Sequence, residues 1–338
     1  MKKIYYKLCL LLFGMGLFCA CEEEMTLKPD AGMLEGIVFD GYITNLAPPY
    51  FFRLTHPSCL QENKLSGKYI HYENIVGAEV IITDVTTGIK DTLVQPACRP
   101  HRDDVFMYIS YYDYYRKRTI TETRYSGNGE GLYITTRLYG IEGHTYTLDI
   151  KYKDKHYSAR EMMVPGTLIT DLKALEVDLG VKGKTLAPCI SFVNRPEEDN
   201  YYMLTYTASS IRGPHYSSLD DITQGAPGAH FSILSDKYLD EEVKDFLVGE
   251  GDAGASYDPP GSDYYALDSL FVHMMSISKD CYDIYDQMIR QLRTDGGAYT
   301  PRPANIKSNI SGGVVWGCFR VSAVTCLLYT SDAADDKA

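Results

Sequence analysis

The residue with the clearest chemical role in the sequence is Cys21, which follows a short apolar run and a small residue. Lys2 and Lys3 precede this run, which covers residues 8–20, and Ala20 stands directly before the cysteine. This order is typical of a bacterial lipoprotein signal, whose peptidase needs a small side chain beside the bond that it cleaves. We therefore predict cleavage before Cys21 and acyl chains on its thiol and its new amino group. An ordinary secretory signal with a chance cysteine is the alternative.

The acyl chains would determine where the protein resides. The apolar run is too short to cross a bilayer as a helix, which needs about 20 apolar residues. Two or more acyl chains make membrane attachment stable, whereas a single chain gives only marginal binding. No later stretch of the sequence is long and apolar enough for a transmembrane helix. We therefore expect a soluble, extracytoplasmic protein that the lipid anchors to the envelope.

The other cysteines suggest disulfides rather than a metal site. The chain has nine cysteines, but no CxxC pair and no cysteine–histidine spacing typical of zinc, so no metal is predicted. An oxidising compartment permits disulfides. Cys59 and Cys98 are the candidate disulfide because both fall in the first predicted domain. Cys281 and Cys318 are a weaker candidate pair in the second domain, and free buried thiols are the alternative.

No catalytic motif stands out in the mature chain. The sequence has eight histidines but no HExxH, no GxSxG and no paired-histidine spacing. The glycine-rich segment 127–131 is not a phosphate loop, because no Lys-Ser or Lys-Thr follows it. We therefore predict that the protein is not an enzyme and binds no cofactor.

Composition narrows the range of partners. The chain has 338 residues, 45% hydrophobic and 23% charged, which is an ordinary globular balance. Its formal net charge is −12, and loss of the three positive charges of Lys2, Lys3 and Lys7 with the signal makes it −15. An acidic surface disfavours nucleic acid and anionic membrane surfaces as partners. It is compatible with cations, neutral glycans or basic peptides.

Tyrosine is the compositional outlier, with 29 Tyr against 11 Phe and one Trp. Tyrosine suits strands and half-wet surfaces, since its ring packs while its hydroxyl stays hydrated. The excess predicts an all-β secreted fold rich in cross-strand tyrosine pairs. A stacking surface for sugars or peptides is the alternative.

The pattern of elements predicts a mainly β fold with two tandem β-sandwich domains, Ig-like or transthyretin-like. Short alternating segments separated by polar turns are the basis of this prediction, and Pro165 and Gly166 mark the best boundary. The predicted organisation is a lipoprotein signal peptide at 1–20, a lipidated tether at 21–34, an N-terminal β-sandwich at 35–165, a C-terminal β-rich domain with helices at 166–325 and a non-native tail at 326–338.

One or two short helices are expected in the second domain. Residues 240–247 carry an apolar stripe at helical spacing. Ser278 is expected to cap a longer helix from Lys279 to about Arg293, whose stripe of tyrosines and aliphatic residues predicts packing against a sheet. The tyrosine-rich segment 106–115 is expected to be a long hairpin or a loop rather than core.

The end of the chain departs from the pattern of strands. Residues 327–338 resemble translated sequencing adapter more than a closing element of the fold. A genuine, disordered acidic tail is the alternative.

Several ordered landmarks resemble one known family. They include DGYIT at 40–44, VGAEV at 76–80 and SNISGG at 308–313. The chain is similar to the Bacteroidota lipoproteins of the domain-of-unknown-function 4249 family, and the resemblance covers nearly all of the mature sequence. The remaining landmarks are residues 50–54, 84, 88, 143–148, 157–165, 276–285 and 317–319.

The resemblance implies a β-rich, outer-membrane lipoprotein that accompanies a TonB-dependent receptor. The acidic residues Glu22, Glu23 and Glu24 resemble the surface-export signal of Bacteroidota lipoproteins, and a solvated tether is the alternative. The expected function is therefore a non-catalytic, surface-exposed accessory to TonB-dependent nutrient capture or uptake. The alternative is a structural or anchoring subunit of a surface fibre, since fimbrial lipoproteins also resemble two tandem sandwiches behind a lipid anchor.

Overall fold

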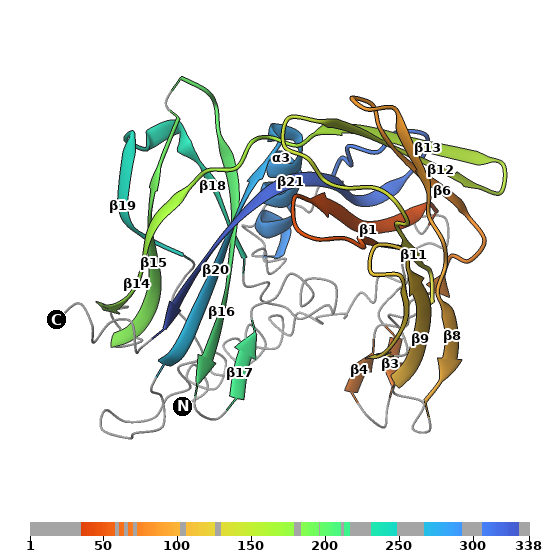
Figure 1. Ribbon diagram of the computed structural model, residues 1–338, viewed down its shortest axis with the longest axis horizontal. Coiled ribbons are helices and arrows are strands. Elements are labelled where there is room, and N and C mark those ends of the chain that lie inside the picture. The colour runs from red at the N-terminus through yellow and green to blue at the C-terminus, as the bar shows by residue number, and fades with distance from the viewer. Residues whose placement is uncertain are drawn as a thin grey trace, which may run out of the picture. The chain divides into compact units, whose positions relative to one another are not determined.

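The fold is mainly β, as the sequence predicts, and its strands form five sheets in the described part of the chain (Figure 1). The computed structural model describes residues 35–57, 61–63, 67–69, 73–101, 106–125, 130–178, 184–195, 197–210, 213–216, 231–248, 267–292 and 306–330. The signal, the tether, Cys59 and residues 331–338 lie outside these ranges.

The largest sheet has nine strands and combines segments from both halves of the sequence. Its order is β11-β2-β1-β21-β20-β16-β17, and β18 and β5 add to β16 and β2. The bounds are β1 Ile37–Thr44, β2 Phe51–His56, β5 Glu73–Asn74, β11 Leu132–Ile134, β16 Tyr201–Ser210, β17 Gly213–Tyr216, β18 Phe231–Ser235, β20 Leu267–Ile277 and β21 Val315–Thr330.

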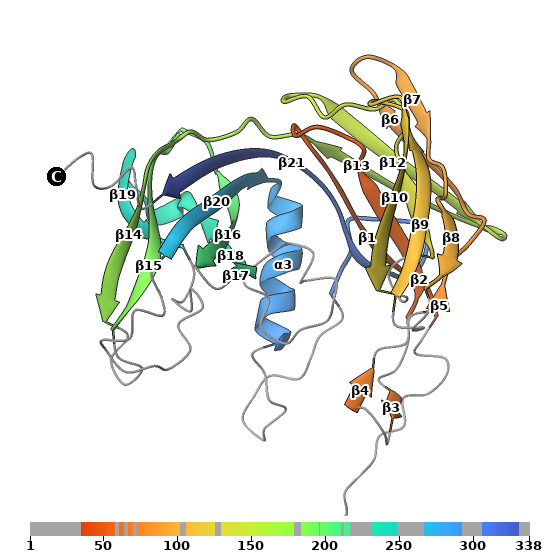
Figure 2. The same ribbon diagram turned by 60° about the horizontal axis from the view of Figure 1, so that its bottom comes forward.

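Strand β21 occupies the middle of this sheet. Residues 315–322 pair in parallel with β1, and residues 323–330 pair antiparallel with β20. Figures 1 and 2 show it as a dark blue ribbon running from β1 to the far end of β20. The predicted boundary between Pro165 and Gly166 therefore separates strands that share one sheet. The predicted tail overlaps the end of β21 at residues 326–330.

The first half contains a sandwich. Alternate side chains of β1 and β21, such as Phe39 and Phe319, pack against inward-facing residues of a four-stranded sheet, such as Tyr146 and Leu148. These alternations bury one face of each sheet, which is the reason the segments form strands rather than helices. The four-stranded sheet has the order β13-β12-β6-β7, with β6 Glu79–Asp84, β7 Ile89–Thr92, β12 Thr145–Tyr152 and β13 Lys155–Met162.

A separate three-stranded sheet of order β10-β9-β8 lies beside β11. Its bounds are β8 Ala97–Pro100, β9 Phe106–Asp113 and β10 Arg118–Tyr125. Met107, Ile109 and Tyr111 of β9 are buried against Leu132 and Ile134. The hairpin predicted for residues 106–115 is thus present, but one of its faces belongs to the core. A small hairpin, β3 Gln61–Asn63 and β4 Gly67–Tyr69, completes the described β structure of this half.

The second half has layers on both faces of the large sheet. Tyr202 and Leu204 of β16 face a three-stranded sheet of order β14-β15-β19, while Met203 faces helix α3 on the opposite side. Helix α3, Lys279–Leu292, confirms the predicted helix, and Figure 2 shows it beside the sheet. The outer strands are β14 Ile169–Asp178, β15 Lys184–Val193 and β19 Glu242–Leu247.

The helix predicted at 240–247 is wrong, because most of that segment is strand β19. Val243 pairs with Phe192 and Phe246 with Ile190, with a register shift between the two pairs. Asp245 between them has φ 50°, a left-handed conformation. Such an irregularity lets residues three apart face the same side of a strand. It therefore reproduces the apolar spacing of a helix.

Candidate functional site

The predicted lipid site lies outside the described residues, as does one half of the predicted first disulfide. Cys21 and Cys59 are both in undescribed segments, so lipidation and the Cys59–Cys98 bond stay predictions. Cys98 lies half-buried on β8, and burial raises the pKa of its thiol. Cys281 and Cys318, in contrast, are brought together: their Sγ atoms are 2.9 Å apart in the core.

The best candidate for a binding surface is the outer face of the β10-β9-β8 sheet. In the strand register Tyr112 stands opposite Thr119 and Ser110 opposite Thr121. These side chains alternate with the buried ones on β9, so they project away from the core. We call this surface the threonine–tyrosine face and define it by residues Ser110, Tyr112, Thr119, Thr121 and Thr123. All are exposed except the half-buried Ser110, and Tyr112 is 45% exposed.

The five residues that define the threonine–tyrosine face are uncharged, although the chain as a whole carries a net charge of −12. Beside them on the same side of the sheet lies the exposed Arg99 of β8, opposite Tyr108 in the strand register. The carboxylates of these two strands, Asp113 and Glu122, occupy positions that alternate with it and pair with Arg116 and Arg124. Across the sheet the Oγ of Ser110 and the Oγ1 of Thr121 are 2.8 Å apart, within hydrogen-bond distance. The surface is therefore an array of uncharged hydroxyl groups with one cation, Arg99, beside it.

Aromatic rings flank this array at both ends. At one end the guanidinium of Arg99 lies 5.1 Å from the centroid of the Tyr108 ring, and the His101 ring lies 4.9 Å from it. At the other end Tyr112 and Tyr114 pack edge to face at 5.0 Å. Tyr114 is 40% exposed, so its ring is available to a ligand.

The turn that carries Tyr114 is held by Asp113. Its fully buried carboxylate accepts hydrogen bonds from the backbone N–H groups of Tyr115 and Arg116 and from Nη1 of Arg116 at 2.7 Å. Burial alone would raise the pKa of Asp113, but the bonds from Arg116 and the backbone outweigh it and lower the pKa. The carboxylate is thus firmly ionised at neutral pH.

A second buried carboxylate, Asp91 on β7, holds the neighbouring loop. Its Oδ2 accepts the N–H groups of Thr136, Arg137 and Leu138 at 2.8–2.9 Å, and its Oδ1 accepts the Thr136 hydroxyl at 2.6 Å. The carbonyl of Leu138 in turn accepts the hydroxyl of Tyr115. Asp91 is therefore a positioning residue for the end of the sheet that bears the exposed tyrosines.

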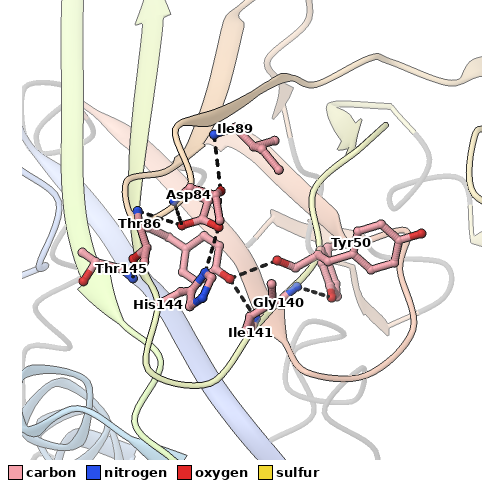
Figure 3. A network of polar contacts seen from close by, with 11 residues as sticks. Tyr50, Asp84, Thr86, Ile89, Gly140, Ile141, His144 and Thr145 are labelled. Carbon is pink, nitrogen blue, oxygen red and sulfur yellow. Dashed lines mark hydrogen bonds and ion pairs between the residues drawn. The ribbon is translucent and has the colours of Figure 1, made fainter.

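Two buried tyrosines, Tyr50 and Tyr146, fix the following loop, and Figure 3 shows Tyr50 beside Gly140. The hydroxyl of Tyr50 accepts the N–H of Gly140 and donates to the carbonyl of Thr44. The hydroxyl of Tyr146 accepts the N–H of Ile141. Gly140 approaches β1 so closely that any Cβ there would clash with the Thr44 carbonyl. Burial raises the pKa of both tyrosines to about 12, so their hydroxyls stay protonated.

Asp84 and His144 form the polar pair at the other side of Figure 3. Nδ1 of His144 lies 2.9 Å from Oδ2 of Asp84, whose carboxylate also accepts the N–H of Thr86 and the hydroxyl of Thr87. Burial raises the pKa of Asp84, but these bonds, led by that of Thr87, lower it overall. The Asp84 carboxylate thus bonds to the turn residues Thr86 and Thr87 and to the imidazole of His144, and this arrangement closes the β6–β7 hairpin.

The segment SNISGG makes a partly buried junction between β13 and β21. The side chain of Asn309 donates to the Phe319 carbonyl and accepts the Phe319 N–H, at 2.8 and 2.9 Å, and so acts as a strand partner for β21. Its Nδ2 also donates to Glu161 of β13 at 2.7 Å. Burial raises the pKa of Glu161, and the bonds from Asn309 and Ser278 only partly oppose this.

Arg320 is buried beside this junction, with 1% of its surface exposed. Its guanidinium lies over the rings of Tyr42 and Tyr285, at 4.5 and 5.9 Å, and its Nη1 contacts Sδ of Met203 at 2.9 Å. None of the ion pairs between described residues includes it, and its Nε has no hydrogen-bond partner. Two aromatic faces therefore stabilise a buried cation.

The sequence predicts Cys281 and Cys318 as a weaker candidate disulfide, with free thiols as the alternative, and the structure places the two together but unbonded. The threonine–tyrosine face and the roles of Asp91, Asn309 and Arg320 were not predicted from the sequence. A signal for the face was present, because Thr119, Thr121 and Thr123 alternate in the sequence. Each of the three buried polar groups depends on a partner 10 to 117 residues away, which local patterns do not reveal.

Comparison with protein families gives one match. Residues 22–326 match the family described as domain of unknown function (DUF4249). Neither a curated protein nor a solved structure matches the chain at a significant level. Within the described ranges, no helix has the length and apolar character needed to span a bilayer.

Proposed function

The chain belongs to the domain of unknown function (DUF4249) family, and from this premise we propose that it is a non-catalytic, lipid-anchored protein of the outer membrane. In this proposal Cys21 carries the lipid, the folded part is exposed at the cell surface, and it assists a TonB-dependent receptor in nutrient capture or uptake. The basic start, the short apolar run and Ala20 before Cys21 support the anchor. The acidic residues after Cys21 support export to the surface.

The observation that carries the capture function is the neutral, hydroxyl-bearing threonine–tyrosine face on an acidic protein. Hydroxyl groups both donate and accept hydrogen bonds, so an array of them suits a ligand that is itself rich in hydroxyls. Exposed tyrosine rings add a flat apolar surface on which a sugar ring can stack. The five residues that define the face are uncharged, so a ligand that covers them alone does not have to desolvate an ion. The ligand class that fits is a neutral glycan.

The anchor is tested by fractionation. We expect the native protein to fractionate with the outer membrane and to incorporate labelled fatty acid. Cys21→Ala should release it from the membrane and abolish the label, because no acyl chain can then attach. Recovery of Cys21→Ala in the membrane fraction at the wild-type level would contradict the anchor.

The capture function is tested by binding of neutral oligosaccharides to the soluble ectodomain in a glycan array, followed by calorimetry. We expect Tyr112→Ala to weaken binding about fivefold, since loss of one stacked ring costs on the order of 1 kcal/mol. Tyr238→Ala is the matched control, because Tyr238 is 88% exposed but lies in the other half of the chain. Equal binding by the two variants would refute the assignment of the face.

The same preparation separates capture from a fibre role. A monomeric ectodomain that binds glycan supports the proposal. Polymers on a non-reducing gel or by electron microscopy, without glycan binding, would replace it with a structural or anchoring role in a surface fibre.

A further inference from the structure

Cys281 and Cys318 face each other across the contact between helix α3 and the large sheet. Cys281 is the third residue of α3, and Cys318 lies on the part of β21 that pairs with β1. Both side chains belong to the apolar cluster between α3 and the sheet, and they are 1% and 6% exposed. Each thiol is therefore shielded from water by the same layer of side chains.

The distance between the two sulfur atoms is the decisive observation. Their Sγ atoms lie 2.9 Å apart, whereas a disulfide bond is about 2.0 Å long. This separation is shorter than the van der Waals contact distance of two unbonded sulfur atoms. A displacement of less than an ångström brings them to bonding distance. The pair is thus closer to a bonded arrangement than to two independent buried thiols.

The backbone on both sides of the pair is fixed. The N–H of Cys281 donates to the capping hydroxyl of Ser278 at 3.2 Å, which sets the start of α3. The neighbour of Cys318, Phe319, is held through both its N–H and its carbonyl by Asn309. The alignment of the thiols is therefore determined by the fold and does not depend on mobile segments.

We propose that Cys281 and Cys318 form a disulfide bond that joins α3 covalently to β21. In this reaction the two S–H bonds break, one S–S bond forms, and two protons and two electrons leave. A disulfide of a thiol–disulfide oxidoreductase in the oxidising envelope takes them up and becomes a dithiol. The bond forms before the core closes over the cysteines, and the finished core then protects it from reductants.

The remaining described cysteines provide an internal comparison. Cys189 is buried on β15, and Cys326 is half-buried further along β21; like Cys281 and Cys318, both are unbonded in the structure, but neither lies in the contact of Cys281 with Cys318. The bond proposed here is specific to the contact of α3 with β21, so these two cysteines should stay reduced in the same molecules.

Peptide mapping of the full-length protein purified from its native envelope tests the proposal. The protein is alkylated in denaturant without reductant and digested with trypsin. Cys281 falls in the peptide 280–290 and Cys318 in the peptide 308–320, each with a single cysteine. We expect these two peptides to be linked, two hydrogen atoms lighter than their sum, and to separate after reduction. The Cys189 peptide, 185–212, should be alkylated without reduction.

Two outcomes would overturn the proposal: full alkylation of both peptides without reductant, or linkage of either cysteine to a different peptide. Variants give a second test that does not depend on mapping. Cys281→Ser, Cys318→Ser and the double variant should lose the same increment of Tm under non-reducing conditions. Cys326→Ser, the matched control, should retain it. A Tm for Cys281→Ser equal to that of the wild type would also exclude the bond.

Discussion

Replacing Asp91 should reveal how strongly its carboxylate secures the loop behind the threonine–tyrosine face. In Asp91→Ala the N–H groups of Thr136, Arg137 and Leu138 lose their acceptor. An unsatisfied buried donor costs about 1–3 kcal/mol, and Arg137 is exposed enough for water to replace the acceptor. The two remaining donors imply a loss of about 2–6 kcal/mol in the free energy of unfolding.

Asp91→Asn separates hydrogen bonding from charge. An asparagine can keep one oxygen in the position of Oδ2 and turn its NH₂ group toward the Thr136 hydroxyl, which then accepts. The three N–H groups stay satisfied, and only the advantage of a charged acceptor is lost, about 1–2 kcal/mol. The expected order of stability is therefore wild type, then asparagine, then alanine.

Urea denaturation followed by circular dichroism measures both variants, with Asp149→Ala as the control. Asp149 is a partly exposed carboxylate on β12, 3.1 Å from Nε2 of His156, and removal of such a surface pair should cost less than about 1 kcal/mol. Hydrogen exchange of residues 135–138 should increase in Asp91→Ala. The reasoning fails if Asp91→Ala costs no more than Asp149→Ala, or if asparagine is as damaging as alanine.

Substitutions at three further residues test the buried charges. Arg320→Lys should lower the unfolding free energy by about 2 kcal/mol or more, because a compact ammonium cannot stack on Tyr42 and Tyr285 as a guanidinium does. Arg320→Met should lower it less, since it leaves no buried charge. Urea titrations that give the reverse order would contradict this prediction. Glu161→Gln should raise the Tm at pH 7 and lose this advantage near pH 4. The reason is that the pKa of Glu161 is raised in the folded state, so its ionisation at higher pH destabilises the fold. A difference in Tm between variant and wild type that stays the same from pH 4 to pH 7 would contradict this. The pKa of Asp113 is lowered in the folded state, so the stabilisation from its carboxylate is present above pH 4 and is lost as the pH falls through the folded-state pKa. Asp113→Asn should therefore lose less Tm than the wild type between pH 5 and pH 2. An equal loss of Tm in the two proteins would count against this role of Asp113.

Elements whose structure is determined by the local pattern of apolar residues were predicted correctly from the sequence. Alternation predicted β1, β12 and β13, and the cap and stripe predicted α3 within a residue of its observed end. The family resemblance is confirmed by the match over residues 22–326. In these segments the buried residues recur at the regular spacing of a strand or a helix, so the sequence alone shows which face is buried.

Sequence reasoning failed where a tertiary contact overrides the local pattern. The irregular backbone at Asp245 gives the apolar residues of β19 the spacing of a helix. The spacing alone therefore predicted a helix where the structure has a strand. The core face of β9 was missed because tyrosines occupy both of its faces: Tyr111 is buried and Tyr112 is exposed. Arg320 could not be identified as buried, since its partners lie on β1 and α3.

Strand β21 has a consequence for any attempt to divide this protein. Phe319 and Val321 fill the sandwich of the first half, Leu327 packs into the second half, and Cys318 and Val324 meet α3. A piece ending at residue 165 would leave the β1 edge that pairs with β21 open to other strands, and would uncover the apolar side chains against which Phe319 and Val321 pack. Expressed separately, the halves should aggregate, and heating the whole protein should give a single calorimetric peak rather than two.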